Sequence, residues 1–216
     1  MIVQVMRRAE EARIGPVIIA CDGEEIAAAV RAHGGTAIVT DPALPSGSDR
    51  IWAALQRYDA AQRHDTIINL QGDLPTLEPH CLHRLCECLR NPEVHIATLA
   101  AEITRPEEHE NPSVVKAVIA LAPSGQQGRA LYFTRTTAPY GGGPRFHHIG
   151  VYGYTRCALA RFVSLPPSPL EQREKLEQLR ALEAGLRIEV AIVNTVPLGV
   201  DTPEDLERAR MLLAHG

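Results

Sequence analysis

The sequence predicts an α/β fold with a mixed, mainly parallel sheet, and two observations support this prediction. Between residues 16 and 90, short apolar segments alternate with longer amphipathic ones. This alternation is typical of βαβ units and of parallel strands. Between residues 95 and 135, three apolar segments follow one another with no helical segment between them. These consecutive strands make the sheet mixed.

The predicted strands are runs of apolar residues bounded by turn-forming residues. They cover residues 16–22, 36–40, 65–70, 95–103, 113–121, 129–135, 146–154 and 187–193.

The predicted helices have apolar residues at helical spacing and recognisable start and stop signals. They cover residues 24–35, 48–62, 78–90, 168–185 and 202–216. Ser168 is an N-cap and Gly185 a terminator of one helix. Thr202 caps the last helix, with Pro203 at its first position and Asp205 completing a capping box.

Length and composition indicate one globular domain over residues 1–216, because 45% of the residues are hydrophobic and 22% are charged. The net charge of −4 and the lack of a basic run argue against a nucleic-acid partner. No apolar segment reaches membrane-spanning length, and the first residues do not have the order of a signal peptide. Five cysteines without paired spacing favour a reducing cytoplasm.

Two aspartates follow predicted strands, where an α/β sheet binds its ligand. Asp73 lies between Gly72, which lets a ligand approach the backbone, and Pro75, which ends the strand. Asp201 precedes the last helix. Taken singly, each aspartate has a structural explanation that is as good as a ligand role. Asp73 could be a turn residue, and Asp201 could simply precede an N-cap. As a pair, the two carboxylates favour one hard cation such as Mg²⁺, which binds oxygen ligands and substrate phosphates.

Residues 46–50, SGSDR, open a helix after another strand. Their backbone N–H groups could hold an anion or the edge of a base. A plain serine N-cap explains the same residues.

Arg135 ends a strand, and His147 and His148 lie in the next one. An arginine and a histidine near a pocket mouth suit a carboxylate or a hydroxyl-rich substrate. A zinc site is disfavoured because no third ligand lies at metal-site spacing. The cysteines of the helix at 78–90 read as inert thiols, since they form no C-x-x-C pair. The loop at 138–145, APYGGGPR, could serve as a lid.

Seven segments occur in a characteristic order: SGSDR, NLQGDLP, NPSVVKAV, ALYFTR, HHIGVYGY, SPLEQREKLEQLR and GVDTPEDLERAR. Together they resemble the 3-deoxy-manno-octulosonate (Kdo) cytidylyltransferases over essentially the whole chain. The resemblance implies a three-layer α/β/α fold of the nucleotide-diphospho-sugar transferase type, usually a homodimer. It implies transfer of CMP from CTP to the anomeric hydroxyl of Kdo in the cytoplasm, with Mg²⁺, for lipopolysaccharide synthesis.

The resemblance also implies roles for individual residues. The Mg²⁺ ligands, and with them the catalytic positions, match Asp73 and Asp201. The nucleotide site matches Ser46, Gly47, Arg50, Gln71 and Gly72. The Kdo pocket matches Arg135, His148, Tyr152, Glu177 and Gln178. No general base is assigned, because a sugar hydroxyl close to a metal loses its proton more readily.

The sequence departs from the family pattern at its start. The family begins with a strand and an Arg/Gly/Lys-rich loop that binds the triphosphate, whereas residues 1–12 match the helix that follows it. Leu74 stands where an acidic residue is usual, and Leu44 and Pro45 stand where a histidine is common. If the natural protein does not start earlier, we expect poor activity and an open sheet edge near residues 17–20. The alternatives are a cytidylyltransferase for another acidic sugar, such as a sialic-acid relative, or a non-catalytic sugar-binding or dimerising protein.

Overall fold

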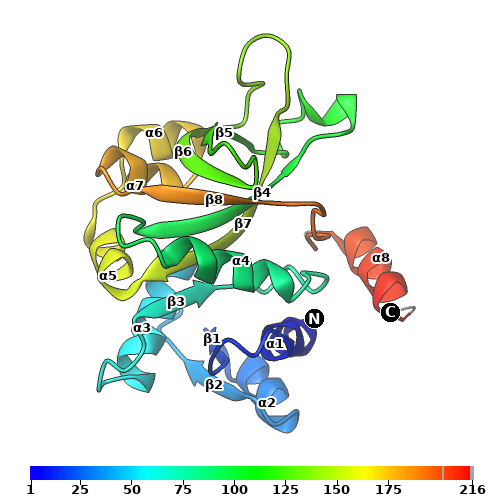
Figure 1. Cartoon of the computed structure of the whole chain (residues 1–216). Helices are drawn as coiled ribbons and strands as arrows, with labels where there is room; N and C mark the ends of the chain where they lie inside the picture. Colours follow the sequence, from blue (N-terminus) through cyan, green and yellow to red (C-terminus); the bar gives the residue numbers. More distant parts are fainter. Residues whose placement is uncertain (201, 215–216) are drawn as a thin grey trace. The chain divides into compact units, whose positions relative to one another are not determined.

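The computed structural model describes residues 1–200 and 202–214. The chain divides into two compact units (Figure 1). The first unit comprises residues 1–65, 69–83 and 197–216, and the second comprises residues 66–68 and 84–196. The single domain expected over residues 1–216 stays a prediction. No helix of the described residues is long and apolar enough to cross a membrane.

The first unit contains one parallel strand pair and several helices. Its complete elements are α1 (Ile2–Glu11), β1 (Ile18–Cys21), α2 (Glu24–Ala32), β2 (Thr36–Val39), α3 (Gly47–Tyr58) and α8 (Pro203–Ala214). β1 and β2 pair in parallel, with Ile18 opposite Thr36. Among the described residues β1 pairs only with β2.

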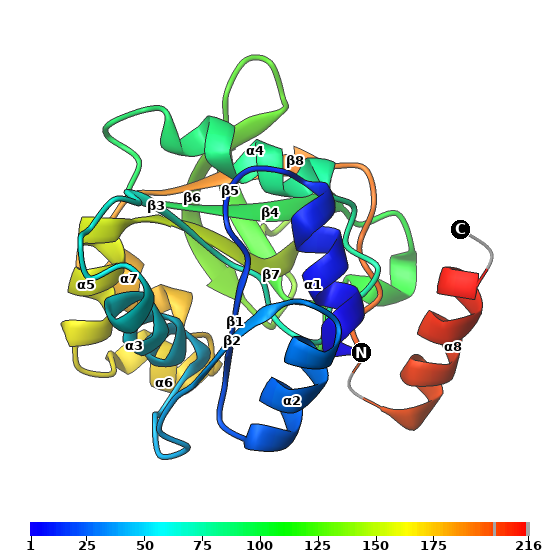
Figure 2. The same cartoon turned by 90° about the horizontal axis from the view of Figure 1, so that it is seen from below.

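Helices α1 and α2 pack against each other (Figure 2). A Cβ atom at Gly35 would lie 2.2 Å from Met6 Sδ and 2.8 Å from Val30 Cγ1. Met6 and Val30 are both buried. A side chain at position 35 would therefore require Met6 and Val30 to shift, whereas Gly34 is favoured by its positive φ of 81°.

The second unit is built on a six-stranded sheet with strand order β3-β7-β4-β8-β6-β5 (Figure 1). The strands are β3 (Thr66–Asn69), β4 (Ile96–Glu102), β5 (Lys116–Leu121), β6 (Gln127–Thr134), β7 (Phe146–Thr155) and β8 (Ile188–Val193). The sheet is mixed, as predicted. However, β4 pairs in parallel with β8, whereas β4–β7, β5–β6, β5–β7 and β6–β8 are antiparallel.

The expectation of a mainly parallel sheet is therefore wrong for this unit. Between β5 and β6 the chain turns at residues 122–125, where Gly125 N–H bonds to the carbonyl of Ala122 at 2.9 Å. Such a short connection can join only antiparallel strands, because parallel neighbours need a crossover.

Four α-helices accompany this sheet: α4 (His80–Leu89), which begins in the first unit, α5 (Arg156–Ser164), α6 (Pro169–Glu174) and α7 (Gln178–Glu183). A single-turn 3₁₀ helix covers Pro106–Glu108. Helix α5 was not predicted from the sequence. Its N-cap is Thr155, whose Oγ1 accepts a hydrogen bond from Ala158 N–H at 3.2 Å.

Two predicted helix boundaries are wrong for identifiable reasons. The helix at 168–185 is broken into α6 and α7, because Lys175 adopts a left-handed conformation with φ of 56°. The helix at 48–62 ends at Tyr58. Beyond it, the carboxylate of buried Asp59 accepts hydrogen bonds from the N–H groups of Arg63 and His64 at 2.9 and 3.0 Å.

The core of the second unit lies along β4, where residues 96–101 are all buried. Helix α4 packs on β7 at a glycine. A Cβ atom at Gly153 would lie 2.9 Å from Leu89 Cδ1 and 3.1 Å from Ile68 Cδ1. The close helix–sheet contact therefore depends on the absence of a side chain there.

Candidate active site

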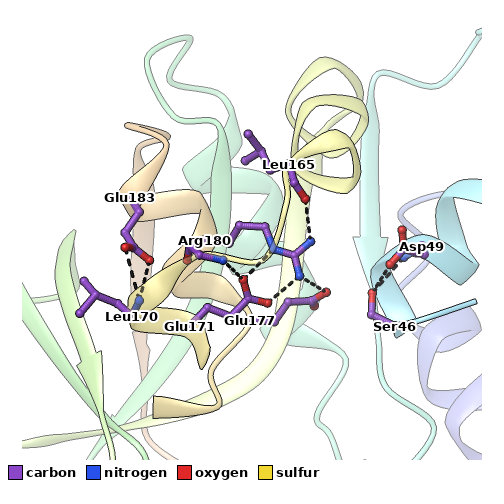
Figure 3. A network of polar contacts seen from close by, with 9 residues as sticks. Ser46, Asp49, Leu165, Leu170, Glu171, Glu177, Arg180 and Glu183 are labelled. Atoms are coloured by element: carbon purple, nitrogen blue, oxygen red, sulfur yellow. Dashed lines mark hydrogen bonds and ion pairs between the residues drawn. The ribbon is translucent and has the colours of Figure 1, made fainter. Parts of the chain in front are cut away.

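The start of α3 presents the first group of predicted site residues. Ser46 is the N-cap, and its Oγ accepts a hydrogen bond from Asp49 N–H at 3.2 Å (Figure 3). The same hydroxyl donates to Asp49 Oδ2 at 2.7 Å. The plain-cap interpretation of Ser46 is thus confirmed as a structural role, and its nucleotide contact stays a prediction.

Gly47 and Gln71 lie side by side. A Cβ atom at Gly47 would lie 3.4 Å from Gln71 Nε2 and 3.6 Å from Gln71 Oε1. The structure therefore brings together two residues that come from different strand-end loops. Gly72 is less constrained, because an added Cβ would meet only Ile2 Cδ1 at 3.5 Å, an ordinary van der Waals distance.

Arg50 is bound to groups of the protein itself. Its Nη1 donates to Thr40 Oγ1 at 2.8 Å and to the Asp41 carbonyl at 3.3 Å, and its Nη2 lies 3.4 Å from Asp22 Oδ2. Asp22 follows β1 and Thr40 follows β2, so Arg50 ties both strand ends to α3. This gives Arg50 a structural role that its position in SGSDR did not indicate.

The loop that carries Asp73 lies beside the segment that leads to the last helix. Val200 N–H donates to the Asp73 carbonyl at 3.0 Å, and Leu198 N–H donates to Thr76 Oγ1 at 2.8 Å. Hydrogen bonds therefore connect the loop of Asp73 to the segment 198–200, which directly precedes the second expected metal ligand. Asp201 itself lies outside the described residues.

Arg135 opens the second group of predicted site residues, which belongs to the second unit. Its guanidinium donates hydrogen bonds to three backbone carbonyls: from Nε to Glu174 at 2.9 Å, from Nη1 to Pro112 at 3.0 Å and from Nη2 to Lys175 at 3.3 Å. The bonds to Glu174 and Lys175 explain the helix break, because Arg135 takes carbonyls that a continuous helix would use internally.

His148 is 8% exposed and lies in an aromatic setting. Its Nε2 is 3.0 Å from Thr98 Oγ1, whose hydroxyl donates to the carbonyls of Ile149 and Val151. Since a hydroxyl has one proton, we assign the Nε2 proton to the histidine. Burial, with a smaller contribution from His147, lowers the pKa of His148 to about 3. The imidazole is therefore neutral at physiological pH.

Tyr152 lies next to His148, with ring centroids 5.6 Å apart. Burial, together with the neighbouring Tyr154 and the carboxylate of Glu177, raises the pKa of Tyr152 well above its usual value. Tyr152 is thus a neutral hydrogen-bonding group. His148, Tyr152 and Glu177 thus lie in one neighbourhood, and their role in binding Kdo stays a prediction.

The start of α7 carries Glu177 and Gln178. Glu177 Oε1 lies 3.6 Å from Arg180 Nη2, and Arg180 also forms a bidentate pair with Glu171 at 2.6 and 2.9 Å (Figure 3). Gln178 is 5% exposed, and its Nε2 has no hydrogen-bond partner among the residues that the structure describes. A buried amide without a partner is costly, which is consistent with a ligand-binding position.

Sequence reasoning assigned no role to Lys116 or Glu174, which surround Arg135. Lys116 is fully buried, and its Nζ donates to the carbonyls of Asn111 and Arg135 at 2.7 and 3.3 Å. A signal was present, because a lysine within the apolar run SVVKAVIAL is unusual.

The alternative zinc and redox interpretations depend on clusters of ligating side chains and on reactive thiols. Within residues 1–200 and 202–214, no group of three or more histidine, cysteine, aspartate or glutamate side chains could hold a metal. Burial raises the pKa of Cys81 and of Cys88 to about 11, so both thiols stay protonated. This agrees with the prediction of inert cysteines.

Comparison with known sequences supports the resemblance. The family model described as Cytidylyltransferase matches residues 1–188. The 3-deoxy-manno-octulosonate cytidylyltransferase of Rhodospirillum rubrum is 62% identical over 214 residues, which cover 99% of this chain and 85% of that relative. A relative of the same name from Parvibaculum lavamentivorans is 63% identical over 215 residues, covering 100% of this chain and 83% of that relative.

Comparison with solved structures agrees with the comparison of sequences. A CMP:2-keto-3-deoxy-manno-octonic acid synthetase complexed with CTP superposes with a TM-score of 0.90 at 37% identity, covering 99% of this chain and 87% of that one. A 4-diphosphocytidyl-2C-methyl-D-erythritol synthase from Anaerococcus prevotii has a TM-score of 0.63 at 10% identity, covering 99% and 89% of the two chains. The second match shows the fold alone. Together they confirm the predicted mixed α/β fold of the nucleotide-sugar transferase type.

Proposed function

Because this chain belongs to the 3-deoxy-manno-octulosonate cytidylyltransferase family, we propose that it transfers CMP from CTP to Kdo and releases pyrophosphate, for lipopolysaccharide synthesis. The observation that carries this proposal is the 62% identity over nearly the whole chain. In the reaction, the anomeric hydroxyl oxygen of Kdo bonds to the α-phosphorus of CTP. The bond from that phosphorus to the β-phosphate oxygen breaks, pyrophosphate leaves with the electron pair, and the hydroxyl proton passes to solvent.

The proposed nucleotide-binding residues all belong to the first unit: Ser46, Gly47, Arg50, Gln71 and Gly72. The contact between Gly47 and Gln71 supports this assignment, because it places a side-chain amide beside the N-terminus of α3. An amide can hydrogen-bond a base edge, and free N–H groups at a helix start favour anions. Arg50 acts by holding the ends of β1 and β2, through Thr40 and Asp22, against the same helix.

Asp73 and Asp201 are the proposed ligands of Mg²⁺. The donor chemistry fits, since carboxylate oxygens and substrate phosphates are the ligands that this cation prefers. The hydrogen bond from Val200 N–H to the Asp73 carbonyl supports the pairing of the two loops. When bound, the cation would neutralise phosphate charge and lower the pKa of the attacking hydroxyl. The contribution of the chain is positioning, which dominates nucleotidyl transfer.

The proposed Kdo-binding residues all belong to the second unit: Arg135, His148, Tyr152, Glu177 and Gln178. We assign the Kdo carboxylate to Arg135, because a guanidinium binds a carboxylate in bidentate geometry. His148 and Tyr152 are held neutral by burial, so they bind hydroxyl groups and add no charge. The unpartnered Nε2 of Gln178 supports a further polar contact to the sugar.

We further propose a homodimer that works in the cytoplasm. The five cysteines are all free, which fits a reducing compartment.

The direct test is formation of CMP-Kdo and pyrophosphate from CTP, Kdo and Mg²⁺. We expect product with Kdo, loss of product on chelation, and recovery when Mg²⁺ is restored. Asp73→Asn should lower kcat/KM at least roughly a hundredfold, since a metal supplies several kcal/mol of charge stabilisation. The matched control is Asp65→Asn, which replaces an exposed aspartate before β3.

Two other outcomes would overturn the proposal in defined ways. Faster product formation with a sialic acid than with Kdo would identify a cytidylyltransferase for another acidic sugar. Absence of product with every sugar, together with no binding of Mg·CTP in calorimetry, would identify a non-catalytic protein.

A further inference from the structure

Arg135 is held at both its side chain and its main chain. Backbone carbonyls accept one hydrogen bond from each of its three guanidinium nitrogens. An arginine carries five such N–H donors, two on each terminal nitrogen and one on Nε. One N–H on Nη1 and one on Nη2 therefore have no partner among the described residues. This pair of donors is what a carboxylate ligand needs for bidentate binding.

Glu174 binds Arg135 twice. Its carbonyl accepts Nε–H of the guanidinium at 2.9 Å, and its carboxylate accepts the backbone N–H of Arg135 at 3.0 Å through Oε2. The other carboxylate oxygen accepts the hydroxyls of Thr134 at 2.8 Å and Tyr132 at 3.4 Å. The end of β6 is therefore fastened to the end of α6 through one glutamate.

Lys116 fixes Arg135 from another segment. Its ammonium donates to the carbonyls of Arg135 and Asn111, and Pro112, the residue after Asn111, accepts Arg135 Nη1–H. The side chain is fully buried, and no carboxylate of the described residues pairs with it. A buried unpaired cation is costly, so packing stability alone does not account for a lysine here.

The same contacts shape the chain that follows Glu174. Arg135 Nη2 binds the carbonyl of Lys175, whose φ of 56° ends α6. Helix α7 then begins at Gln178, whose Nε2 lacks a partner. Arg135 and the start of α7 are thus positioned by one hydrogen-bond network.

We propose that Glu174 and Lys116 are positioning residues for recognition of the acidic sugar, acting by fixing the guanidinium of Arg135 and the turn that leads to Gln178. This inference rests on the proposed function, which places the Kdo carboxylate on Arg135. It adds two residues that do not themselves contact the substrate. Their removal should weaken sugar binding and leave nucleotide binding intact.

The test compares Glu174→Gln with Glu183→Gln in the full-length chain. Glutamine at 174 places an amide donor where one carboxylate oxygen accepted an N–H or hydroxyl. We expect the KM for Kdo to rise roughly tenfold, with kcat and the KM for CTP changed less than about twofold. Glu183 accepts Leu170 N–H at the far ends of the same two helices, so its variant should leave both KM values unchanged. Lys116→Met is a second variant that should give the same selective rise, and apolar replacement of a buried charge is usually tolerated.

A second readout does not depend on catalysis. The Nε–H proton of Arg135, assigned in the nitrogen-15 spectrum by its absence from Arg135→Lys, should exchange with water at least about tenfold faster in Glu174→Gln than in the wild type. Unchanged exchange would overturn the positioning role. Faster exchange with an unchanged KM for Kdo, or equal rises in both KM values, would show a purely structural role and overturn the inference. If the wild type forms no CMP-Kdo, the proposed function fails, and the exchange measurement alone then decides whether Glu174 positions Arg135.

Discussion

Replacing His148 with glutamine should change how the stability of the protein depends on pH. Burial holds the pKa of His148 at about 3 in the folded protein, against 6.5 for an ordinary histidine. Because the folded pKa is the lower one, the unfolded chain takes up a proton first as the pH falls. The neutral imidazole therefore contributes full stability above pH 6.5, and this contribution is lost progressively between pH 6.5 and 3.

The size of the effect follows from the two pKa values. Between pH 7.5 and 5.0, the unfolded chain binds nearly one proton at this position and the folded protein binds almost none. The free energy of unfolding should fall by about 2 kcal/mol from this residue alone. For a chain of this size that shift corresponds to roughly 0.7–1 M in the urea midpoint.

Urea unfolding at pH 7.5 and 5.0 provides the assay. In His148→Gln, the loss of stability between these two pH values should be smaller than in the wild type by about 2 kcal/mol, because glutamine does not titrate. Thr98→Val is the matched control. It removes the hydroxyl bonded to Nε2 but keeps the buried histidine, so the variant should be less stable at both pH values with the pH dependence of the wild type. Equal losses in the wild type and in His148→Gln would refute the reasoning.

Three further substitutions test other parts of the fold. Asp59→Asn should lower the thermal midpoint, because the carboxylate accepts the N–H groups of Arg63 and His64. Those hydrogen bonds and the His64 ion pair outweigh burial and lower the pKa of Asp59 to about 2. The stability of the wild type should therefore decline as the pH falls from 3.8 through 2. Equal acid unfolding curves for the wild type and Asp59→Asn would contradict this. Lys175→Gly should leave the free energy of unfolding in urea unchanged or raise it by up to about 1 kcal/mol, since glycine adopts a positive φ without strain. Lys175→Ala should not raise it. Gly153→Ala should lower the free energy of unfolding by about 1–3 kcal/mol, because the new methyl group would lie 2.9 Å from Leu89 Cδ1. A variant as stable as the wild type would show that α4 moves freely on β7.

Local signals predicted most of the elements and the ends of several helices. The capping box of α8 is an example, because Thr202 and Asp205 exchange hydrogen bonds within one turn of helix. Ser46 caps α3 in the same way. Such contacts join residues three apart in the sequence, so composition and spacing are sufficient to find them.

The break between α6 and α7 shows where local signals fail. Residues 168–185 have helical spacing throughout, and nothing in that stretch specifies a left-handed residue at Lys175. The carbonyls of Glu174 and Lys175 bind the guanidinium of Arg135, which directly follows β6 and lies 39 residues earlier than Glu174. No window of sequence contains both partners.

The same distinction between local signals and tertiary contacts applies to the candidate site residues. The ordered motifs predicted residue types suited to a metal, a nucleotide and an acidic sugar, because those types reflect the chemistry of such ligands. The tertiary structure decided which groups are already engaged by the protein: Arg50 by Asp22 and Thr40, and Arg135 by three carbonyls. It also decided that His148 is neutral, since its pKa depends on the strands that exclude water from it. The sequence by itself determined the chemical groups, and only packing determined their charge and orientation, because burial and long-range hydrogen bonds arise between residues far apart in the chain.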